Sequence, residues 1–196
     1  MTLLLLNYLG IFVFAISGAL VAGRKQMDIF GFVVLALMPA IGGGTLRDLI
    51  LDVPVFWIVD HNYLYLTLAA ALLTFLIYRP LERVSRALSW FDAVGLSVFC
   101  VLGTAKALTI TGSATIAVMM GVVTAVAGGI VRDTVANDVP LVLRHEVYAT
   151  AAFIGAVAFV ALQALAVPFA QWLAIAAALA VRTLGIVKGL SLPRAA

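Results

Sequence analysis

Long runs of apolar residues, separated by short polar segments, make up most of this chain. Each run approaches the roughly 20 residues that an α-helix needs to cross the hydrocarbon core of a membrane. Polar segments such as Arg24–Asp28 and Tyr78–Arg86 separate the runs. The pattern predicts an all-α membrane protein with seven transmembrane helices, at residues 3–22, 30–51, 62–78, 89–106, 112–136, 146–165 and 169–187.

The composition agrees with a chain embedded in lipid. Hydrophobic residues make up 65% of the 196 residues and charged residues 11%, which is more apolar than a water-soluble domain of this size. The N-terminal stretch has no basic region and no small-residue cleavage pattern. We therefore expect it to be the first span rather than a signal peptide, and we expect residues 1–196 to form a single membrane domain.

Basic residues predict the orientation of the chain. Three of the 12 Lys and Arg residues, Arg47, Arg132 and Arg182, fall inside predicted spans. Of the other nine, only Lys106 falls on one side of a seven-span arrangement. Because cytoplasmic loops carry the excess of basic residues, we expect the N-terminus outside and the C-terminus in the cytoplasm. Charges at span ends also give no indication of nucleic-acid binding, although the pI is near 9.3. The eight residues on the cytoplasmic side are Arg24, Lys25, Arg79, Arg83, Arg86, Arg144, Lys188 and Arg194.

The first half of the chain resembles the second half at an offset of 85 residues. Between Asn7 and Leu51, 11 of 45 positions are identical at this offset, and several identities fall on Gly, Arg and Asp. One inserted residue would then align Asp52 with Asp138. We interpret this as an internal duplication, with repeat one at 1–80, repeat two at 86–166 and a seventh helix at 169–187. Three spans per repeat make the second copy inverted in the membrane, an arrangement that commonly builds a solute path between repeats.

Glycine clusters occur in the second and fifth predicted spans. The segments "GGGTLRD" and "GGIVRD" contain Gly42, Gly43 and Gly44 in one copy and Gly128 and Gly129 in the other. Glycine weakens a helix, and broken backbone in a membrane is tolerated only where it faces protein or a water-filled cavity. We predict that both spans are kinked here and that these glycines line a polar path. The alternative is that they only allow two helices to pack closely.

An arginine and an aspartate follow each glycine cluster. Arg47 and Asp48 would lie toward the outer side of the membrane, and Arg132 and Asp133 toward the inner side. Ionisable residues inside a membrane are costly and mark functional sites by default. We therefore predict that these four residues lie on the ion pathway. The alternative is that they form local ion pairs that fix the helix ends.

Four other polar residues have repeat-related positions. Asp52 and Asp138 precede Val-Pro, so we expect each of them to end a helix in a turn. Asn7 and Asp92 occupy equivalent places near the starts of spans one and four. Capping of a helix N-terminus and lining of the path are both open for this pair.

We expect two further basic residues and the two histidines to have no role in ion transport or catalysis. We expect Lys106 to anchor an outer helix end and Arg182 to extend to the cytoplasmic interface. His61 and His145 have no metal-ligand partners at useful spacing. The sequence also has no phosphate-binding loop and no zinc or nucleophile motif, so we expect no enzyme activity, no cofactor and no bound metal.

The doubled Gly-Gly-x-x-Arg-Asp motif, together with "FDAVGL" at the start of span four, resembles the TRIC family of trimeric intracellular cation channels, in particular its prokaryotic branch. The resemblance covers nearly the whole chain. It implies a homotrimer in the cell membrane, in which each subunit encloses its own hourglass pore for K+ and Na+, lined by kinked spans two and five. Ala127 stands where a third glycine would match Gly42, so the second kink is expected to be milder.

Two functions stay open at this point. The first is a passive channel for monovalent cations, surrounded by membrane lipid. The second is a secondary transporter for a small zwitterion such as glycine, because Arg would bind a carboxylate and Asp an ammonium group. A cation channel should instead favour acidic groups or backbone carbonyls along its path.

The charge count yields a testable topology. A reporter enzyme fused after Arg194 should be active in the cytoplasm, and a reporter inserted near Asp60 should be active outside. A cytoplasmic signal near Asp60 would contradict both the orientation and the inverted repeat.

Overall fold

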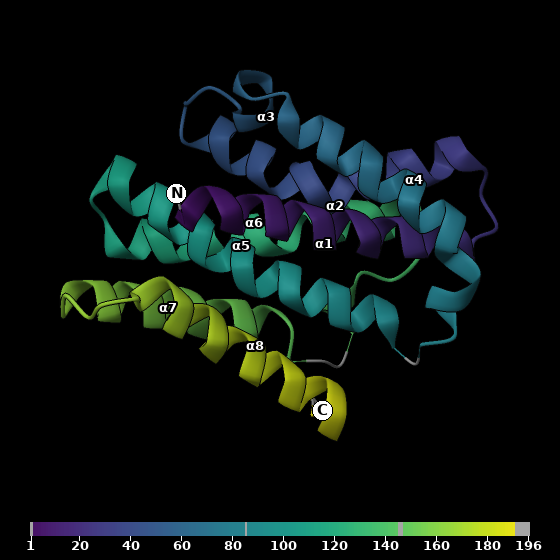
Figure 1. Ribbon diagram of the computed structural model, residues 1–196. Helices are drawn as coiled ribbons and strands as arrows, with labels where there is room; N and C mark the ends of the chain where they lie inside the picture. The colour runs from purple at the N-terminus through teal and green to yellow at the C-terminus, as the bar shows by residue number, and fades with distance from the viewer. Residues whose placement is uncertain (1, 85, 145–146, 191–196) are drawn as a thin grey trace.

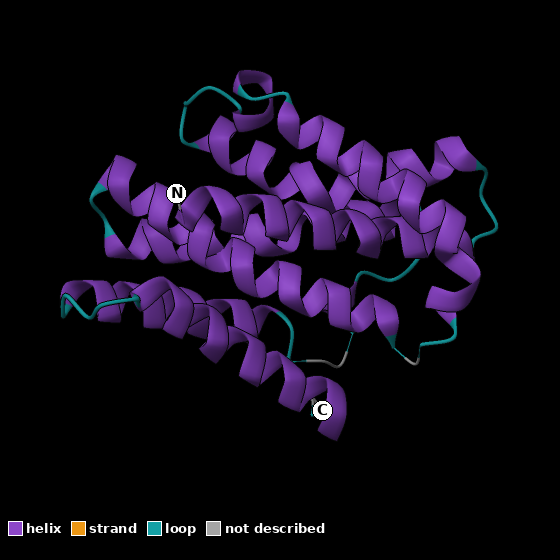
Figure 2. Ribbon diagram, viewed as in Figure 1, coloured by secondary structure: helices purple, strands orange, loops and turns teal. Residues whose placement is uncertain are grey.

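The computed structural model of the protein describes residues 2–84, 86–144 and 147–190, and these residues form helices joined by short loops (Figures 1 and 2). The α-helices are α1 (Thr2–Arg24), α2 (Ile29–Ile50), α3 (Phe56–Val59), α4 (Asn62–Glu82), α5 (Ala87–Thr111), α6 (Ala114–Val135), α7 (Ala149–Ala164) and α8 (Ala170–Lys188), and η1 (Leu141–Leu143) is a single 3₁₀ turn.

The expected all-helical fold is confirmed. Within the described residues, each of the seven longer helices coincides with one predicted span to within a few residues, and the sequence did not predict the short α3 and η1. Six helices are long and apolar enough to cross a membrane, whereas α7 has 16 residues. Seven crossings therefore stay a prediction. His145, Glu146 at the start of the predicted span 146–165, and Arg194 lie outside the described residues.

The two halves begin their second long helix in the same way. Asp28 accepts a hydrogen bond from the backbone N–H of Gly31 at 2.8 Å, and Ser113 accepts one from that of Ile116 at 3.4 Å. Each side chain satisfies an amide that would otherwise be unpaired at the N-terminus of a helix. Asp28 and Ser113 are 85 residues apart, and α6 both begins and ends 85 residues after α2.

The C-terminal turns of α2 and α6 correct the expected alignment. Asp52 and Asn137 both have a left-handed backbone, with φ of 52° and 54°, as residues that follow a helix often do. In each turn the next amide bonds back to a carbonyl five residues earlier, Val53 to Asp48 at 3.0 Å and Asp138 to Asp133 at 2.8 Å.

Asp52 therefore lies in the turn that ends its helix, as predicted. In the second half Asn137 takes the equivalent position, and Asp138 lies in the same turn, which its amide closes. No inserted residue separates the halves here, because the offset stays at 85 through both turns. The side chain of Asp138 also forms an ion pair with Lys25 at 2.7 Å.

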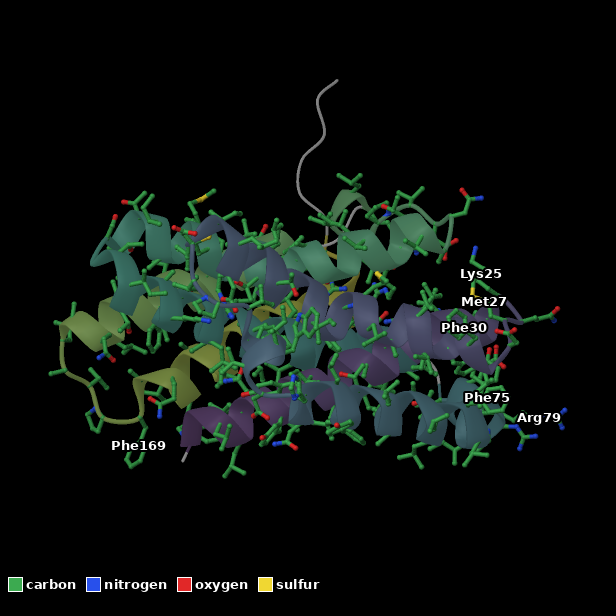
Figure 3. All side chains as sticks on the ribbon, turned by 90° about the horizontal axis from the view of Figure 1, so that it is seen from above. Lys25, Met27, Phe30, Phe75, Arg79 and Phe169 are labelled. Atoms are coloured by element: carbon green, nitrogen blue, oxygen red, sulfur yellow. The ribbon has the colours of Figure 1, made fainter. Side chains whose placement is uncertain are left out.

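The helices pair alike in the two halves. Helices α1, α2, α5 and α6 make the most extensive contacts, α4 packs on α1 and α2, and α7 packs on α5 and α6. Helix α1 runs opposite to α5, and α2 opposite to α6 (Figure 1). Helix α8 packs on α7 and α5 and ends at the opposite end of the bundle from the start of α1. Lys25 and Arg79 lie at one end, and Phe169 lies at the other (Figure 3).

The glycine clusters do not interrupt their helices, and the kink and the path lining expected at these glycines stay predictions. Helices α2 and α6 are continuous through Gly42–Gly44 and Gly128–Gly129. A Cβ atom at Gly43 would clash with the carbonyl oxygen of Thr124, and one at Gly128 would lie 2.8 Å from the Cα of Pro39. The glycines thus bring two backbones into direct contact, as small residues do between membrane helices.

A departure from helical geometry occurs in α4 instead. Ile77 has φ −105° and ψ 16°, and Pro80 follows three residues later. Proline removes a backbone donor and crowds the preceding turn, which accounts for a bend at this place.

The crossing of α2 and α6 can be tested with two alanine variants. Gly43→Ala places a methyl group against the backbone of α6, whereas the same methyl at Gly42 would meet its nearest atom, the Cα of Gly128, at an ordinary 3.6 Å. We expect Gly43→Ala to lower the free energy of unfolding by about 1–3 kcal/mol and Gly42→Ala to change it far less. Thermal unfolding of the purified proteins in detergent measures this, and equal effects of the two variants would contradict the described crossing.

Candidate functional site: two arginine clusters at opposite ends of the α2–α6 pair

The first cluster, here called the Arg47 cluster, joins α2, α3 and α5. Nε of Arg47 donates to Oδ1 of Asp48 at 2.8 Å, and Nζ of Lys106 donates to the same oxygen at 2.8 Å. Oδ2 of Asp48 accepts the backbone N–H of Phe56, the first residue of α3, at 3.0 Å. The Arg47 guanidinium lies 5.9 Å from the centre of the Phe56 ring. The Asp48 carboxylate therefore ties the end of α2 to both α3 and α5.

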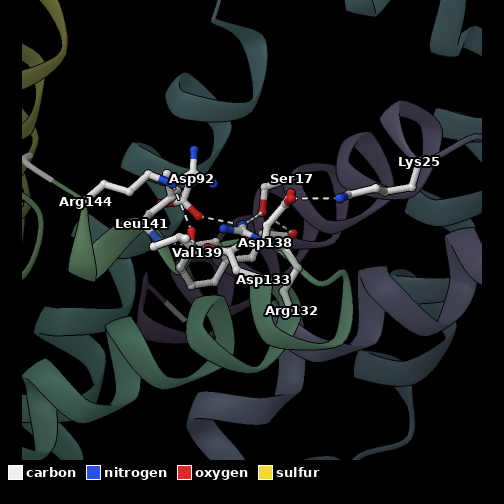
Figure 4. Close-up of polar contacts among 10 residues, drawn as sticks. Ser17, Lys25, Asp92, Arg132, Asp133, Asp138, Val139, Leu141 and Arg144 are labelled. Carbon is white, nitrogen blue, oxygen red and sulfur yellow. Dashed lines mark hydrogen bonds and ion pairs between the residues drawn. The ribbon is translucent and has the colours of Figure 1, made fainter.

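The second cluster, the Arg132 cluster, joins α1, α5 and α6 (Figure 4). Nε of Arg132 donates to Oδ1 of Asp133 at 2.7 Å. Its Nη1 donates to Oδ1 of Asp92 at 2.7 Å and to Oγ of Ser17 at 3.0 Å. Oδ2 of Asp133 accepts the backbone N–H of Leu141 at 2.9 Å.

The two clusters share one local design. In each, an arginine binds the next residue in the chain, and that aspartate also accepts an amide eight residues further on. A buried carboxylate is costly unless it is paired and hydrogen-bonded, and this arrangement satisfies both of its oxygens. The ion pairs of the alternative interpretation are therefore present, and the place of these four residues on an ion pathway stays a prediction.

The second-half cluster has more acceptors than the first. At the offset of 85, Asp92 corresponds to Asn7, and Ser17 corresponds to Leu102. Among the described residues, the hydrogen bond that Arg47 makes is the one to Asp48. The Arg47 end thus has the uncharged residues Asn7 and Leu102 at the positions that correspond to the two interhelical acceptors of Arg132, Asp92 and Ser17.

Burial follows the same asymmetry. Arg132 and Asp92 are fully buried, whereas Arg47 is 5% exposed and about a third of the Lys106 side chain is exposed. A cavity of about 460 Å³ opens beside Arg47 and is lined in part by Asn7 and Tyr63. The Arg47 end is therefore open to small solutes, and the Arg132 end is packed.

The structure corrects several sequence expectations about polar residues. Asp92 does not cap a helix, because it lies inside α5 and binds Arg132. Lys106 does more than anchor a helix end, since it pairs with Asp48. Arg182 does not extend to an interface but is fully buried, with its guanidinium 5.0 Å from the centre of the Tyr148 ring.

Sequence reasoning missed Ser17 and Tyr148 as members of the Arg132 end. Both are fully or almost fully buried. The offset of 85 offered one signal, because it places Tyr148 on Tyr63, which lines the cavity at the other end. No repeat-related signal existed for Ser17, since its counterpart is Leu102.

The predicted glycines divide between two environments. Gly43 and Gly128 are buried in the helix crossing, and Gly42 faces Gly128. Gly44 faces the ring of Phe56, and Gly129 faces the Tyr148 hydroxyl and the Arg132 guanidinium. Only the last two therefore lie next to the charged clusters.

A family of known proteins has the same sequence pattern and fold. The model of the family described as "Glycine transporter" matches residues 4–79 and 89–164, two segments that are again 85 residues apart. A crystal structure of the TRIC trimeric intracellular cation channel orthologue from Rhodobacter sphaeroides superimposes with a TM-score of 0.92 at 45% identity, over 96% of this chain and 99% of that one. The chain belongs to the TRIC family.

Other members support this assignment. A prokaryotic TRIC channel crystallised in 0.5 M KCl has a TM-score of 0.91 at 31% identity, over 98% of this chain and 99% of that one. A UPF0126 membrane protein of Vibrio cholerae is 50% identical over 161 residues, which cover 79% of this chain and 66% of that protein. The inner membrane protein YadS of Escherichia coli is 46% identical over 154 residues, 78% of this chain and 74% of its own length.

These relatives are channels and membrane proteins rather than enzymes. The chain is accordingly a multi-pass inner membrane protein of the TRIC family and not an enzyme. The comparisons also confirm the resemblance on which the sequence-based expectation of this family rested.

The buried Arg132–Asp92 pair yields a stability prediction. Asp92→Asn leaves Arg132 without one of its two carboxylate partners in a fully buried place, which typically costs about 3–5 kcal/mol. Asp138→Asn breaks the pair with Lys25, in which both side chains are about one-third exposed, and it should cost at most about 1 kcal/mol. Thermal unfolding in detergent compares the two variants. Equal stability of Asp92→Asn and wild type would show that Asp92 is not the counter-charge of Arg132.

Proposed function

We propose that this TRIC-family protein is a channel for the monovalent cations K+ and Na+, assembled as a homotrimer with one path in each subunit. The observation that carries the proposal is the 45% identity with a protein described as a trimeric intracellular cation channel orthologue. The match covers 96% of this chain and 99% of that one. A second similar protein, 36% identical, was analysed as a structural basis for conductance through TRIC cation channels.

In this proposal the path follows α2 and α6 through the centre of the subunit. These helices cross at their glycines and carry Arg47, Asp48, Arg132 and Asp133 near their C-terminal ends. Because the two helices run in opposite directions (Figure 1), the charges lie at opposite ends of the bundle. Ionisable side chains on membrane helices usually mark a pathway, since lipid does not solvate them.

Conduction would require the Arg132 end to rearrange. Arg132 is fully buried between Asp92 and Asp133, so ions have no room to pass beside it in this conformation. Within the described residues, Nη2 of Arg132 is buried without a hydrogen bond to another protein group.

A carrier for glycine is the second candidate, and two observations favour it. The matching family model is described as a glycine transporter. The cavity beside Arg47 and Lys106 has a volume of about 460 Å³, which falls in the usual range of roughly 300–1,000 Å³ for small-molecule sites. One end open and the other closed is also what alternating access requires.

The two candidates differ in their response to Arg47→Ala. Removing this guanidinium makes the outer end more negative, so a cation channel should keep or increase its K+ conductance, whereas a glycine carrier should lose transport because the carboxylate loses its partner. Arg24→Ala removes an exposed arginine at an end of α1 and serves as the control.

Single-channel recording in planar bilayers and glycine uptake into proteoliposomes measure the two activities. Discrete current steps that persist in Arg47→Ala support the channel. Glycine uptake without current steps, abolished in Arg47→Ala but not in Arg24→Ala, would replace the proposal by the carrier.

A further inference from the structure

The cavity at the Arg47 end presents positive charge to solvent and hides the negative charge. Arg47 and Lys106 both line it, and both donate to the same oxygen of Asp48. The Asp48 side chain is 0% exposed, whereas that of Lys106 is 33% exposed and that of Arg47 is 6% exposed. A solute in the cavity therefore meets two cationic groups before it meets the single carboxylate behind them.

The carboxylate has little capacity left for a cation in the cavity. Its Oδ1 already accepts from Arg47 and Lys106, and its Oδ2 accepts the backbone N–H of Phe56. The nearby carboxylate of Asp60 accepts a hydrogen bond from Tyr8 at 3.2 Å and is not part of the cavity lining. The lining thus combines an excess of one positive charge with the polar residues Asn7 and Tyr63.

The second half of the chain shows what is missing here. Arg132 has a second carboxylate, Asp92, at the place where Arg47 has Asn7. The Arg47 cluster also has a second cation, Lys106. The residue that corresponds to Lys106 in the other half of the chain is the apolar Val21. The same arginine motif is therefore neutralised by a protein carboxylate at one end and is left with excess positive charge beside a cavity at the other.

We propose that the cavity beside Arg47 and Lys106 binds a small monovalent anion, a halide or the carboxylate of a small solute. The anion supplies at this end the counter-charge that Asp92 supplies to Arg132 at the other end. Guanidinium and ammonium groups form strong charge-assisted hydrogen bonds with such anions. The consequence for ion flow rests on the proposed channel function: a bound anion neutralises the mouth of the path, which would otherwise repel cations.

The binding itself is tested without any flux measurement. The line width of the bromide NMR signal, recorded with purified protein in a neutral detergent, reports bromide that exchanges with a protein site. Asn7→Asp introduces at this end the carboxylate that Asp92 provides at the other, while both cations stay in place. It should weaken bromide binding at least about tenfold, because the new charge lies close to the site.

Two lysine variants complete the test. Lys106→Met removes a cavity cation and should also abolish the excess broadening. Lys25→Met removes a lysine that is equally exposed and equally paired with an aspartate, but lies outside the cavity, and it should leave the broadening unchanged. The inference is overturned if wild type broadens the bromide signal no more than Asn7→Asp does, or if Lys25→Met lowers it as much as Lys106→Met. Retained trimer on size-exclusion chromatography shows that each variant is folded.

Competition distinguishes the two sources of the anion. Formate that displaces bromide with glycine inactive identifies a site for simple anions, and glycine that competes more strongly than formate identifies the carboxylate of a zwitterion. In bilayers at constant K+ activity, the K+ current of wild type should rise with bromide and that of Asn7→Asp should not. Bromide binding without any current would refute the channel and keep the anion site, and current without bromide binding would do the reverse.

Discussion

The structure depends on the cost of placing a carboxylate and a guanidinium inside a membrane protein. Asp48 and Asp133 are almost fully buried, and a charge in such surroundings is tolerated only when it is paired and hydrogen-bonded. Each carboxylate meets this condition with the preceding arginine and with an amide eight residues further along the chain. This requirement fixes the turns after α2 and α6 and positions α3 and η1 over the helix ends.

The glycines serve this arrangement by setting the distance between helices. Gly43 and Gly128 allow α2 and α6 to touch backbone to backbone. The two helices therefore cross without bulky side chains between them. In lipid, where no hydrophobic force brings helices together, such close contact is a main source of association. The two arginine clusters are thereby held at opposite ends of one central helix pair.

The two ends of the α2–α6 pair differ in charge, and the proposed functions depend on this difference. Asp92 closes the Arg132 end with a buried ion pair, while Asn7 and Lys106 leave the Arg47 end open and cationic. A channel and a carrier would use this difference differently, the first as a gate at one end and the second as one state of alternating access. In either case the neutral Asn7 matters as much as the charged residues around it, because it leaves the Arg47 end without the carboxylate that Asp92 provides at the other end.

The sequence alone determined the helices, the family and the positions of the charged motifs, because apolar runs, span-end charges and an 85-residue offset are local or linear properties. It did not determine what the glycines do, since Gly43 reads equally as a kink or as a contact until Thr124 is known to lie against it. It also misplaced Arg182, which looked like an interfacial residue but is buried over Tyr148. Only the tertiary structure decided these points, because the partner of a buried polar group comes from another helix and its distance along the chain gives no indication of its proximity.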